Sequence, residues 1–281
     1  MSRLEVLCAT MHQTDFSKIE EMNIQSDVVF ANQHDGHSYN EYRFGQFIAR
    51  MITTDQRGVG KNRNAALLYA KGDICLFADD DVRYINGYQD LILAAFQEVP
   101  DADVLIFNLD SGEVRTQKKN HTIKRIRIWN ALKYGAVRIA VKLDSVQKRN
   151  IWFTTLFGGG CKYPSGEDSL WLIEAARKGL KIYAHPLVIG TISMQDSTWF
   201  KGYDEEYFFG RGAWAQAAMP KTKYAMFFYY ILRLRRLSNL SFQTMIRMMC
   251  AGAKCFREGV SFGEWYGKSS AKEVNNQGEH S

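Results

Sequence analysis

The chain has 281 residues, of which 46% are hydrophobic and 13% aromatic, and this length and composition exclude a disordered chain and suit an ordered globular protein with a full core. The net charge of +6 is confined to the C-terminal end, because residues 221–281 carry ten basic and four acidic residues whereas residues 1–220 are neutral. A neutral body without a recognised binding motif argues against nucleic acid as a partner.

The five cysteines, Cys8, Cys75, Cys161, Cys250 and Cys255, form no C-x-x-C pair. Their odd number and scatter favour reduced thiols over a disulfide framework or a zinc site. The N-terminal residues show no signal-peptide pattern, and no run of about 18 apolar residues occurs. We therefore expect a cytoplasmic protein without a membrane span.

The N-terminal part of the chain predicts a parallel strand–helix–strand unit. Apolar runs at residues 4–10 and 27–32 predict strands, and residues 16–22 predict a short helix between them. The polar residues 34–40 are expected to form a loop after the second strand. Ligands of open α/β sheets bind beyond the carboxyl ends of the strands. The candidate pocket residues are therefore Thr10, Met11, His12, Asn32 and Gln33.

The next stretch combines a glycine turn, a helix and a buried strand. Residues 47–54 predict a third strand that leads into a turn at Gly58. The run from Ala65 to Ala70 predicts a helix with Gly72 as its C-terminal cap. Residues 74–78 are an apolar run, which predicts a buried strand.

Three adjacent carboxylates, Asp79, Asp80 and Asp81, follow this strand directly. Adjacent acids repel one another, and a divalent metal with a bound phosphate relieves the repulsion because hard cations take oxygen ligands. Alternate side chains share a face in an extended segment, so Asp79 and Asp81 are expected to point one way and Asp80 the other. A solvated acidic turn before the next helix is the alternative interpretation.

Together these motifs resemble the nucleotide-sugar half of family-2 glycosyltransferases with the A-type fold. In that family the pattern reads approximately Gly-x-x-x-x-Arg-Asn, then Ala-x-Gly-Asp, then an apolar strand ending in Asp-x-Asp. Here it stands at residues 58–64, 70–73 and 79–81. The resemblance covers about residues 4–218 and implies a single α/β transferase domain with a mostly parallel central sheet.

The resemblance implies an inverting transfer of a sugar from a nucleoside diphosphate, with a UDP-sugar favoured, to a hydroxyl of a glycan or lipid-linked acceptor in polysaccharide biosynthesis. A Mn²⁺ or Mg²⁺ ion held by Asp81, with help from Asp79, would offset the charge on the diphosphate leaving group. Lys61 and Arg63 would neutralise phosphate or orient the nucleotide. The donor-binding residues are then Thr10, Met11, His12, Asn32, Gly58, Lys61, Arg63, Asn64, Asp79 and Asp80.

The middle of the chain continues the α/β pattern. Residues 88–99 predict a helix that ends before Pro100, and residues 104–109 and 139–143 predict strands. Five basic residues lie close together between them: Lys118, Lys119, Lys124, Arg125 and Arg127. They are consistent with a solvated loop or with an edge that faces phosphate or a membrane.

A second motif begins at Gly158, Gly159 and Gly160, which permit unusual backbone angles or the close approach of a ligand. The helix that follows is expected to run to residue 178, with Gly179 as its cap. The resemblance places the acceptor near the three glycines and near Trp199.

Asp168 near the start of this helix has two interpretations. Its spacing from Ser165 is that of a capping box. The resemblance instead implies that Asp168, beside Glu167, is the base that activates the acceptor hydroxyl, and the first motif favours this role.

Residues 181–183 and 187–192 predict two more strands, after which many A-type transferases carry a metal-binding histidine. Residues 191–196 contain no histidine, so Asp196 and water both remain candidates for the last metal ligand. The missing histidine supports an alternative function as a degenerate transferase that acts as a binding or scaffold protein. The joint presence of Asp79, Asp81 and Asp168 argues against that alternative.

The C-terminal part predicts an aromatic-rich helix over residues 204–218 and two further amphipathic helices. One apolar stripe comprises Tyr224, Phe227, Phe228, Ile231 and Leu234, and the other comprises Phe242, Met245, Ile246, Met249, Ala253 and Phe256. Arg247 and Lys254 lie opposite the second stripe. These helices either pack on the body or contact an anionic membrane at the periphery, on its cytoplasmic side. The expected division is a transferase domain over 1–220, basic helices over 221–260 and a disordered polar tail over 261–281.

Overall fold

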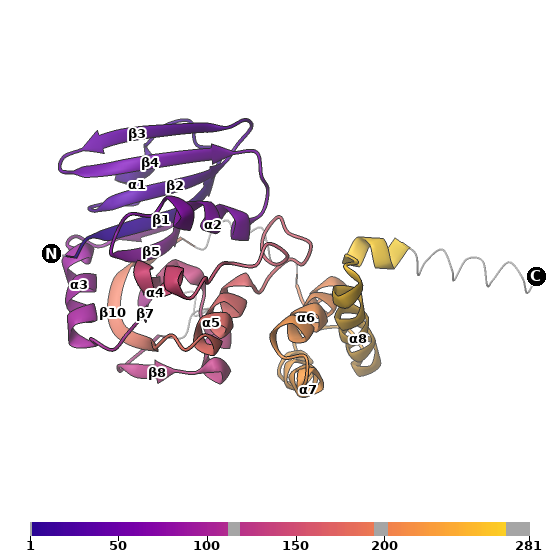
Figure 1. Ribbon diagram of the computed structural model, residues 1–281. Helices are drawn as coiled ribbons and strands as arrows, with labels where there is room; N and C mark the ends of the chain where they lie inside the picture. Colours follow the sequence, from indigo (N-terminus) through magenta and orange to yellow (C-terminus); the bar gives the residue numbers. More distant parts are fainter. Residues whose placement is uncertain (1, 112–118, 194–201, 268–281) are drawn as a thin grey trace, which may run out of the picture. The chain divides into compact units, whose positions relative to one another are not determined.

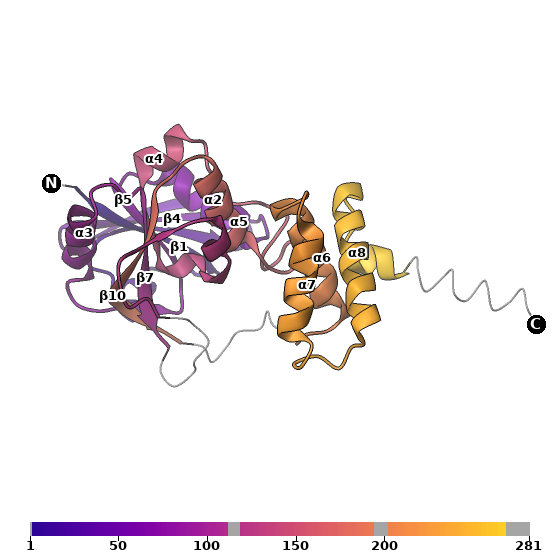
Figure 2. The same ribbon diagram turned by 90° about the horizontal axis from the view of Figure 1, so that it is seen from below.

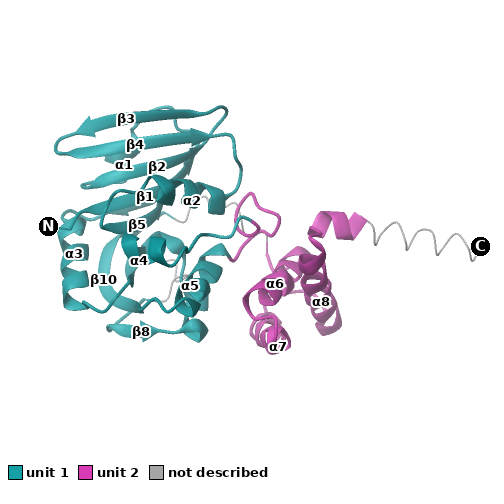
Figure 3. Cartoon of the chain, viewed as in Figure 1, with its two compact units in different colours: residues 1–155, 167–197 teal, residues 156–166, 198–281 magenta. Residues whose placement is uncertain are grey.

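The computed structural model describes residues 2–111, 119–193 and 202–267 (Figure 1). The chain forms two compact units, which Figure 3 colours separately. The α/β unit comprises residues 1–155 and 167–197, and the helical unit comprises residues 156–166 and 198–281. This division differs from the expected boundary after residue 220, because the helix over residues 205–218 belongs to the helical unit.

A mixed sheet of ten described strands forms the centre of the α/β unit, in the order β3-β4-β2-β1-β5-β9-β7-β10-β6, with β8 paired to β10. Its strands are β1 (Leu4–Met11), β2 (Asp27–Gln33), β3 (Ser38–Phe44), β4 (Phe47–Thr54), β5 (Ile74–Asp79), β6 (Val82–Tyr84), β7 (Val104–Asp110), β8 (Lys124–Ile126), β9 (Ile139–Lys142) and β10 (Ile182–Ile192). Among them β1, β2, β4, β5, β7 and β10 run in one direction. The predicted α/β fold with a mostly parallel sheet is confirmed.

The register of the three central strands brings polar residues together at one edge of the sheet. In the middle of β1, Cys8 pairs with Phe30 of β2 and Ala78 of β5, and all three side chains are buried. At the carboxyl ends Thr10 pairs with Asn32, and Ala9 pairs with Asp79. The apolar strand centres therefore position polar strand ends beside one another.

The expected loop over residues 34–40 is wrong in its second half. Residues Ser38–Phe44 form β3, an edge strand that pairs antiparallel with β4. Six of its seven residues are exposed. An edge strand that is exposed on both faces shows no apolar alternation, so its polar sequence predicts a loop.

The helices of the α/β unit are α1 (Lys18–Glu21), α2 (Val59–Tyr69), α3 (Tyr88–Glu98), α4 (Leu143–Lys148) and α5 (Glu167–Arg177), with two 3₁₀ helices, η1 (Ile128–Lys133) and η2 (Ala136–Arg138). Helix α2 begins six residues before the predicted start at Ala65. Gly72 is not its cap, since the helix ends in Ala70 with an extended backbone. Instead, a Cβ at Gly72 would lie 2.6 Å from the Cβ of Glu5, so the glycine permits β1 to approach closely.

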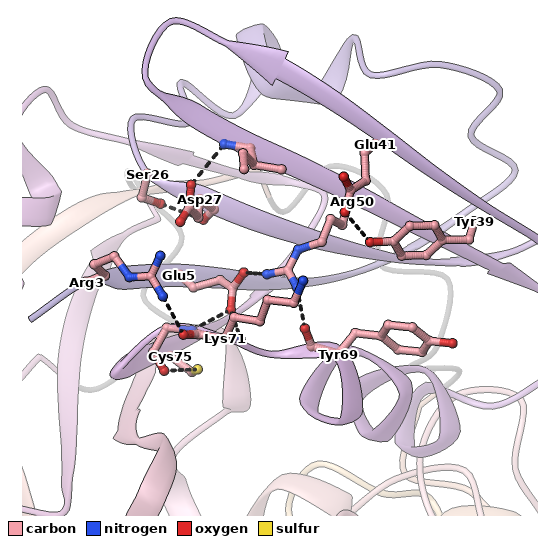
Figure 4. A network of polar contacts seen from close by, with 12 residues as sticks. Arg3, Glu5, Ser26, Asp27, Tyr39, Glu41, Arg50, Tyr69, Lys71 and Cys75 are labelled. Atoms are coloured by element: carbon pink, nitrogen blue, oxygen red, sulfur yellow. Dashed lines mark hydrogen bonds and ion pairs between the residues drawn. The ribbon is translucent and has the colours of Figure 1, made fainter.

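A buried polar network fixes α2 against the sheet at this end (Figure 4). The Glu5 carboxylate forms an ion pair with Arg50, and their side chains are only 1% and 4% exposed. The second oxygen of Glu5 accepts hydrogen bonds from the backbone N–H groups of Lys71 and Gly72, at 2.6 and 2.9 Å. Arg50 also donates to the carbonyl oxygen of Tyr69, at 2.7 Å. Each buried charge therefore has an opposite charge and further hydrogen-bond partners.

Two other expectations for the α/β unit are refined by the structure. The separate strands predicted over 181–183 and 187–192 are one strand, β10, whose register against β7 shifts between Ala184 and Gly190. Part of the basic run forms the short strand β8, while Lys118 lies outside the described residues. The end of α5 is as predicted, because Gly179 follows it with a φ of +84°.

Helices α6 (Glu205–Ala218), α7 (Lys223–Leu234) and α8 (Phe242–Glu258) form the helical unit, and Figure 2 shows them side by side. Helices α6 and α8 approach closely at two glycines. A Cβ at Gly212 would collide with the carbonyl of Met249, and one at Gly252 would collide with the carbonyl of Phe209. The absence of side chains at both glycines thus allows the two backbones to touch.

The predicted apolar stripes agree only partly with the packing of α7 and α8. Met226, which was not predicted, is buried in α7, whereas Tyr224 and Phe228 are exposed. In α8 the exposed side chains include Phe242 and Ile246. Residues 262–267 are helical, so the expected disorder is wrong for them, and residues 268–281 lie outside the described part. No helix of the described residues is long and apolar enough to cross a membrane.

Candidate active site

The candidate active site lies at the carboxyl ends of β1 and β5, where α2 and α5 begin. Three of the predicted acids, Asp79, Glu167 and Asp168, meet here although about 90 residues separate the first from the other two. They meet at one guanidinium group, that of Arg63 in α2. The two sequence motifs therefore form one site within the α/β unit.

Arg63 is the centre of this group, and its side chain is only 3% exposed. One terminal nitrogen donates to Asp168 at 2.6 Å and to Glu167 at 3.2 Å. The other donates to both oxygens of Asp79, at 3.0 and 3.3 Å. The guanidinium also lies 5.4 Å from the ring centre of Phe153. We call Arg63, Asp79, Glu167 and Asp168 the Arg63 cluster.

The Arg63 cluster contains one positive charge and three carboxylates. This excess of negative charge contributes to the shifted pKa values of its members. Burial lowers the pKa of Arg63, but the charges of Asp79, Asp168 and Glu167 outweigh it and raise the pKa. Burial raises the pKa of Asp79 against the opposing charge of Arg63. Burial and the neighbouring Glu167 likewise raise the pKa of Asp168, although Arg63 and a backbone hydrogen bond from Ala136 oppose this. The cluster thus favours the arrival of a further cation or proton.

Local contacts hold Arg63 in this place. Helix α2 begins at Gly58, whose φ of +120° suits only glycine and whose N–H donates to the side chain of Gln33 at 2.9 Å. The amide of Asn64 donates to the carbonyl of Phe153 and accepts from its N–H, at 2.9 and 2.8 Å. The Phe153 ring stacks on Trp171 of α5, with centroids 5.5 Å apart. This aromatic contact connects the start of α2 to the helix that carries Asp168.

Comparisons with known proteins agree with this geometry. Residues 38–154 match the sequence profile described as Glycosyl transferase family 2. These residues therefore resemble a family-2 glycosyltransferase domain. No curated protein sequence matches the chain.

Solved structures that resemble this chain include S. aureus TarS 1–349 in complex with UDP-GlcNAc, with a TM-score of 0.58 and 14% identity over 92% of this chain and 93% of that chain. The complex of TarS 1–349 with UDP has the same score and identity, over 90% and 83% of the two chains. A mannosyltransferase from Pyrobaculum calidifontis, in complex with GDP-Man and Mn²⁺, has a TM-score of 0.48 at 14% identity, over 97% and 80%. The likeness to TarS shows that this chain has the A-type fold.

The predicted donor-binding residues differ in whether their side chains are used within the protein. Some side chains are used within the protein: Asn32 is 1% exposed and bonds to the backbone of Gln13, and Thr10 donates to the Asp80 carboxylate. Others are exposed, and these are Met11, His12 and Lys61. Asp79 and Asp80 thus have different partners, Arg63 and Thr10. The exposed group remains available to a nucleotide.

Arg63 has contacts that the sequence did not indicate. The resemblance implied that it neutralises phosphate or orients the nucleotide, and the structure shows a buried side chain whose two terminal nitrogens contact carboxylates of the chain itself. Asn62, which was not predicted, donates from its buried side chain to the carbonyl of Thr10 at 3.0 Å. Contacts of this kind join residues that are 52 positions apart, so no local pattern in the sequence indicates them.

The predicted acceptor residues belong to the helical unit or lie outside the described residues. Gly158 and Gly160 have positive φ values of 107° and 73°, as the glycine run suggested, and Gly159 lies between them in the same loop. Trp199 and Asp196 lie outside the described residues. The assignment of the acceptor to this loop stays a prediction.

Ser165 and Asp168, the two residues of the predicted capping box, have different side-chain partners. The hydroxyl of Ser165 accepts a hydrogen bond from Arg211, at 2.9 Å. The Asp168 carboxylate accepts from Arg63 and from the backbone of Ala136. The choice between a helix cap and a base stays a prediction for Asp168.

The residues present fit a divalent cation only together with a bound diphosphate. The described residues contain no group of three or more His, Cys, Asp or Glu side chains arranged to hold a metal. Asp81, however, is exposed, and partial burial and the charges of Asp79 and Asp80 raise its pKa to about 6. An exposed carboxylate next to other acids suits Mg²⁺ or Mn²⁺ when phosphate oxygens supply further ligands.

Proposed function

We propose that the transferase moves a sugar from a UDP-sugar to a hydroxyl group of a glycan or lipid-linked acceptor, with inversion at the anomeric carbon. The observation that carries this proposal is the Arg63 cluster, which unites the acids of two motifs at the carboxyl edge of the sheet. Ligands of open α/β sheets bind at this edge. The UDP and UDP-GlcNAc bound to TarS support the choice of a uridine nucleotide.

Asp168 is the proposed base. A direct displacement needs a group that removes the proton of the acceptor hydroxyl on the face opposite the leaving group. The Asp168 side chain is 24% exposed, so it can reach a substrate while Arg63 holds one of its oxygens. Glu167, at 12% exposure, is the more enclosed of the pair.

Arg63 is a positioning residue in this scheme. Its bonds to Asp168 and to Asp79 set the distance between the base and the acidic strand end. Its charge also opposes the rise in the pKa of Asp168, and a base must be deprotonated to accept a proton. Arg63 therefore prepares the site without contacting the donor.

Asp81 is the proposed principal ligand of a Mn²⁺ or Mg²⁺ ion, with Asp79 as a second candidate. Such an ion, when bound with the donor, offsets negative charge on the diphosphate leaving group. Asp80, fixed by Thr10, lies at the edge where the nucleotide would bind. The exposed Lys61, Met11 and His12 are the proposed remaining contacts of the donor.

We also propose that the basic C-terminal part of the chain contacts a membrane, where a lipid-linked acceptor would be found. The net charge of +6 lies entirely in residues 221–281, and basic residues near an anionic surface attract it. A peripheral contact of this kind would bring a lipid-linked acceptor of polysaccharide biosynthesis to the transferase. This part of the proposal is independent of the chemistry at Asp168.

A donor panel tests the central part of the proposal. The transferase is incubated with UDP-, GDP- and dTDP-sugars in the presence of Mn²⁺, and the released nucleoside diphosphate is measured. We expect release of UDP from a UDP-sugar. A chelator should abolish this release, and Asp81→Asn should reduce it at least tenfold. Asp144→Asn, on the exposed face of α4, is the matched control and should leave the release unchanged. Release from no donor, with normal thermal unfolding, would favour the degenerate scaffold protein.

A further inference from the structure

Helix α7 carries large apolar side chains on two faces. One face packs inside the helical unit through Met226, Phe227, Ile231 and Leu234, whose exposure is 8% or less. A helix of a globular protein ordinarily has polar residues on the opposite face. Here the opposite face is also apolar.

The outward face of α7 consists of Tyr224, Phe228 and Leu232, which follow one another at intervals of four residues. Their exposed fractions are 66%, 56% and 48%. Residues four apart lie on the same side of an α-helix, so the three side chains form one continuous strip. Leu237, just beyond the helix, is 61% exposed.

Basic residues lie at both ends of this strip. Lys221 precedes α7, and Arg235 and Arg236 follow it; all three are exposed. No acidic residue occurs between Lys221 and Arg257. An apolar strip between clusters of basic residues is the pattern of helices that lie in the interfacial region of an anionic bilayer.

Helix α8 exposes a shorter apolar surface, which consists of Phe242 and Ile246. Its small and apolar face is used within the helical unit, where Gly252 and Ala253 are buried. Its exposed basic residues also have acidic neighbours, since Arg247 lies 3.9 Å from Glu205 and Lys254 lies 3.9 Å from Glu258. The charges of α8 are therefore partly neutralised, whereas Lys221, Arg235 and Arg236 form no ion pair among the described residues.

We propose that the outward face of α7, from Lys221 to Leu237, is the surface that contacts an anionic lipid bilayer. In this contact Phe228 and Leu232 enter the boundary between headgroups and acyl chains, and Arg235 and Arg236 contact lipid phosphates. The inference rests on the proposed peripheral membrane contact and deepens it by naming the surface.

The charge distribution favours lipid over a second copy of the chain. A two-fold contact through this face would place the basic ends of one strip near those of the other, because the same patch is used by both partners. Like charges at a contact oppose association. An anionic bilayer supplies both apolar volume and negative charge.

Vesicle sedimentation of the full chain tests the proposal. The vesicles contain equal parts of phosphatidylglycerol and phosphatidylcholine, with pure phosphatidylcholine for comparison. Two double variants are used, Phe228→Ser with Leu232→Ser, and Arg235→Gln with Arg236→Gln. The matched controls are Leu68→Ser, a leucine that is 70% exposed on α2, and Lys148→Gln with Arg149→Gln, an exposed basic pair at α4.

We expect the wild-type chain to sediment with the anionic vesicles and far less with the neutral ones. The arginine pair should lower the partition coefficient roughly 30-fold, since each basic residue near an anionic surface is worth about a factor of five. The apolar pair should lower it at least about tenfold. Both control variants should bind vesicles as the wild type does. UDP affinity and thermal unfolding should be unchanged in all four variants.

Three results would overturn the inference, and they are distinguishable. Equal sedimentation of the α7 variants and the wild type would place the membrane contact elsewhere on the chain. Failure of the wild type to bind anionic vesicles would remove the proposed membrane contact itself. A wild-type dimer that Phe228→Ser with Leu232→Ser converts to a monomer, without vesicle binding, would make this face an interface between copies.

Discussion

Two buried arginines, Arg50 and Arg63, have nearly the same exposure but opposite surroundings. Arg50, 4% exposed, faces the single carboxylate of Glu5, whose other oxygen accepts two backbone N–H groups. Arg63, 3% exposed, faces three carboxylates, and its Nε has no hydrogen-bond partner among the described residues. The charge around Arg50 is balanced, whereas negative charge is in excess around Arg63.

The balanced pair is consistent with a structural role, and the unbalanced cluster is consistent with the proposed active site. The ion pair of Glu5 and Arg50 is enclosed and balanced in charge, so it requires no further counter-charge. It joins β1, β4 and the end of α2. The acids around Arg63 are partly exposed, at 38%, 12% and 24% for Asp79, Glu167 and Asp168. Perturbed pKa values in a group that solvent can reach are typical of functional sites.

Removal of the balanced pair should cost the most stability. Glu5→Gln leaves the buried charge of Arg50 without its partner, and such a change typically lowers the free energy of unfolding by about 3–5 kcal/mol. Denaturant unfolding measures it, with Asp101→Asn as the control, because Asp101 pairs with Lys181 on the surface. The comparison would fail if both variants unfolded at the same denaturant concentration.

Arg63→Lys should affect turnover more than binding. A lysine ammonium cannot reproduce the planar fork that contacts carboxylates of two elements, so Asp168 should lose its position. We expect kcat to fall about 100-fold, a loss typical of a displacement near 1 Å, while the KM for the donor stays within a few-fold. Steady-state kinetics separates the two constants, and Arg149→Lys on the surface is the control.

The opposite pattern would contradict the positioning role. An increase in the donor KM at unchanged kcat would mean that Arg63 binds the phosphate of the donor, as the sequence pattern first suggested.

The smallest of these effects is a pH dependence that Asp81 imposes on donor binding. Its raised pKa of about 6 means that Asp81 takes up a proton and loses its charge as the pH falls through 6. Affinity for UDP with Mn²⁺ should therefore be constant above pH 7 and fall up to tenfold for each unit well below 6. Calorimetry in Asp81→Asn should show weak, pH-independent binding. A wild-type profile that stays flat down to pH 5 would exclude Asp81 as the ligand.

The sequence predicted those parts of the fold that depend on local patterns. The apolar runs of β1, β2 and β5 are visible because both faces of these strands are buried, and the acids at their ends follow directly. The edge strand β3 has no apolar face, so its pattern predicted a loop. The contact of Arg63 with Asp168 joins residues 105 positions apart. Motif spacing therefore predicted the residues of the candidate site but not the contact between Arg63 and Asp168.

The outward face of α7 shows a different limit of prediction from the sequence. Tyr224, Phe227, Phe228 and Ile231 are all apolar at helical spacing, so the sequence placed them on one stripe. The structure separates them, with Phe227 and Ile231 buried and Tyr224 and Phe228 exposed. A helix that is apolar on both faces cannot be oriented from its sequence alone.

The most direct test of the Arg63 cluster as an active site is the substitution Asp168→Asn, assayed for both sugar transfer and UDP affinity in one preparation. The amide keeps the shape of the side chain, and Arg63 retains Asp79 and Glu167. Loss of a general base lowers the rate by about 10²–10⁴-fold, so we expect transfer to fall by this factor while UDP affinity with Mn²⁺ and thermal unfolding stay at wild-type values. Transfer within a few-fold of the wild type, with normal unfolding, would remove Asp168 from the mechanism.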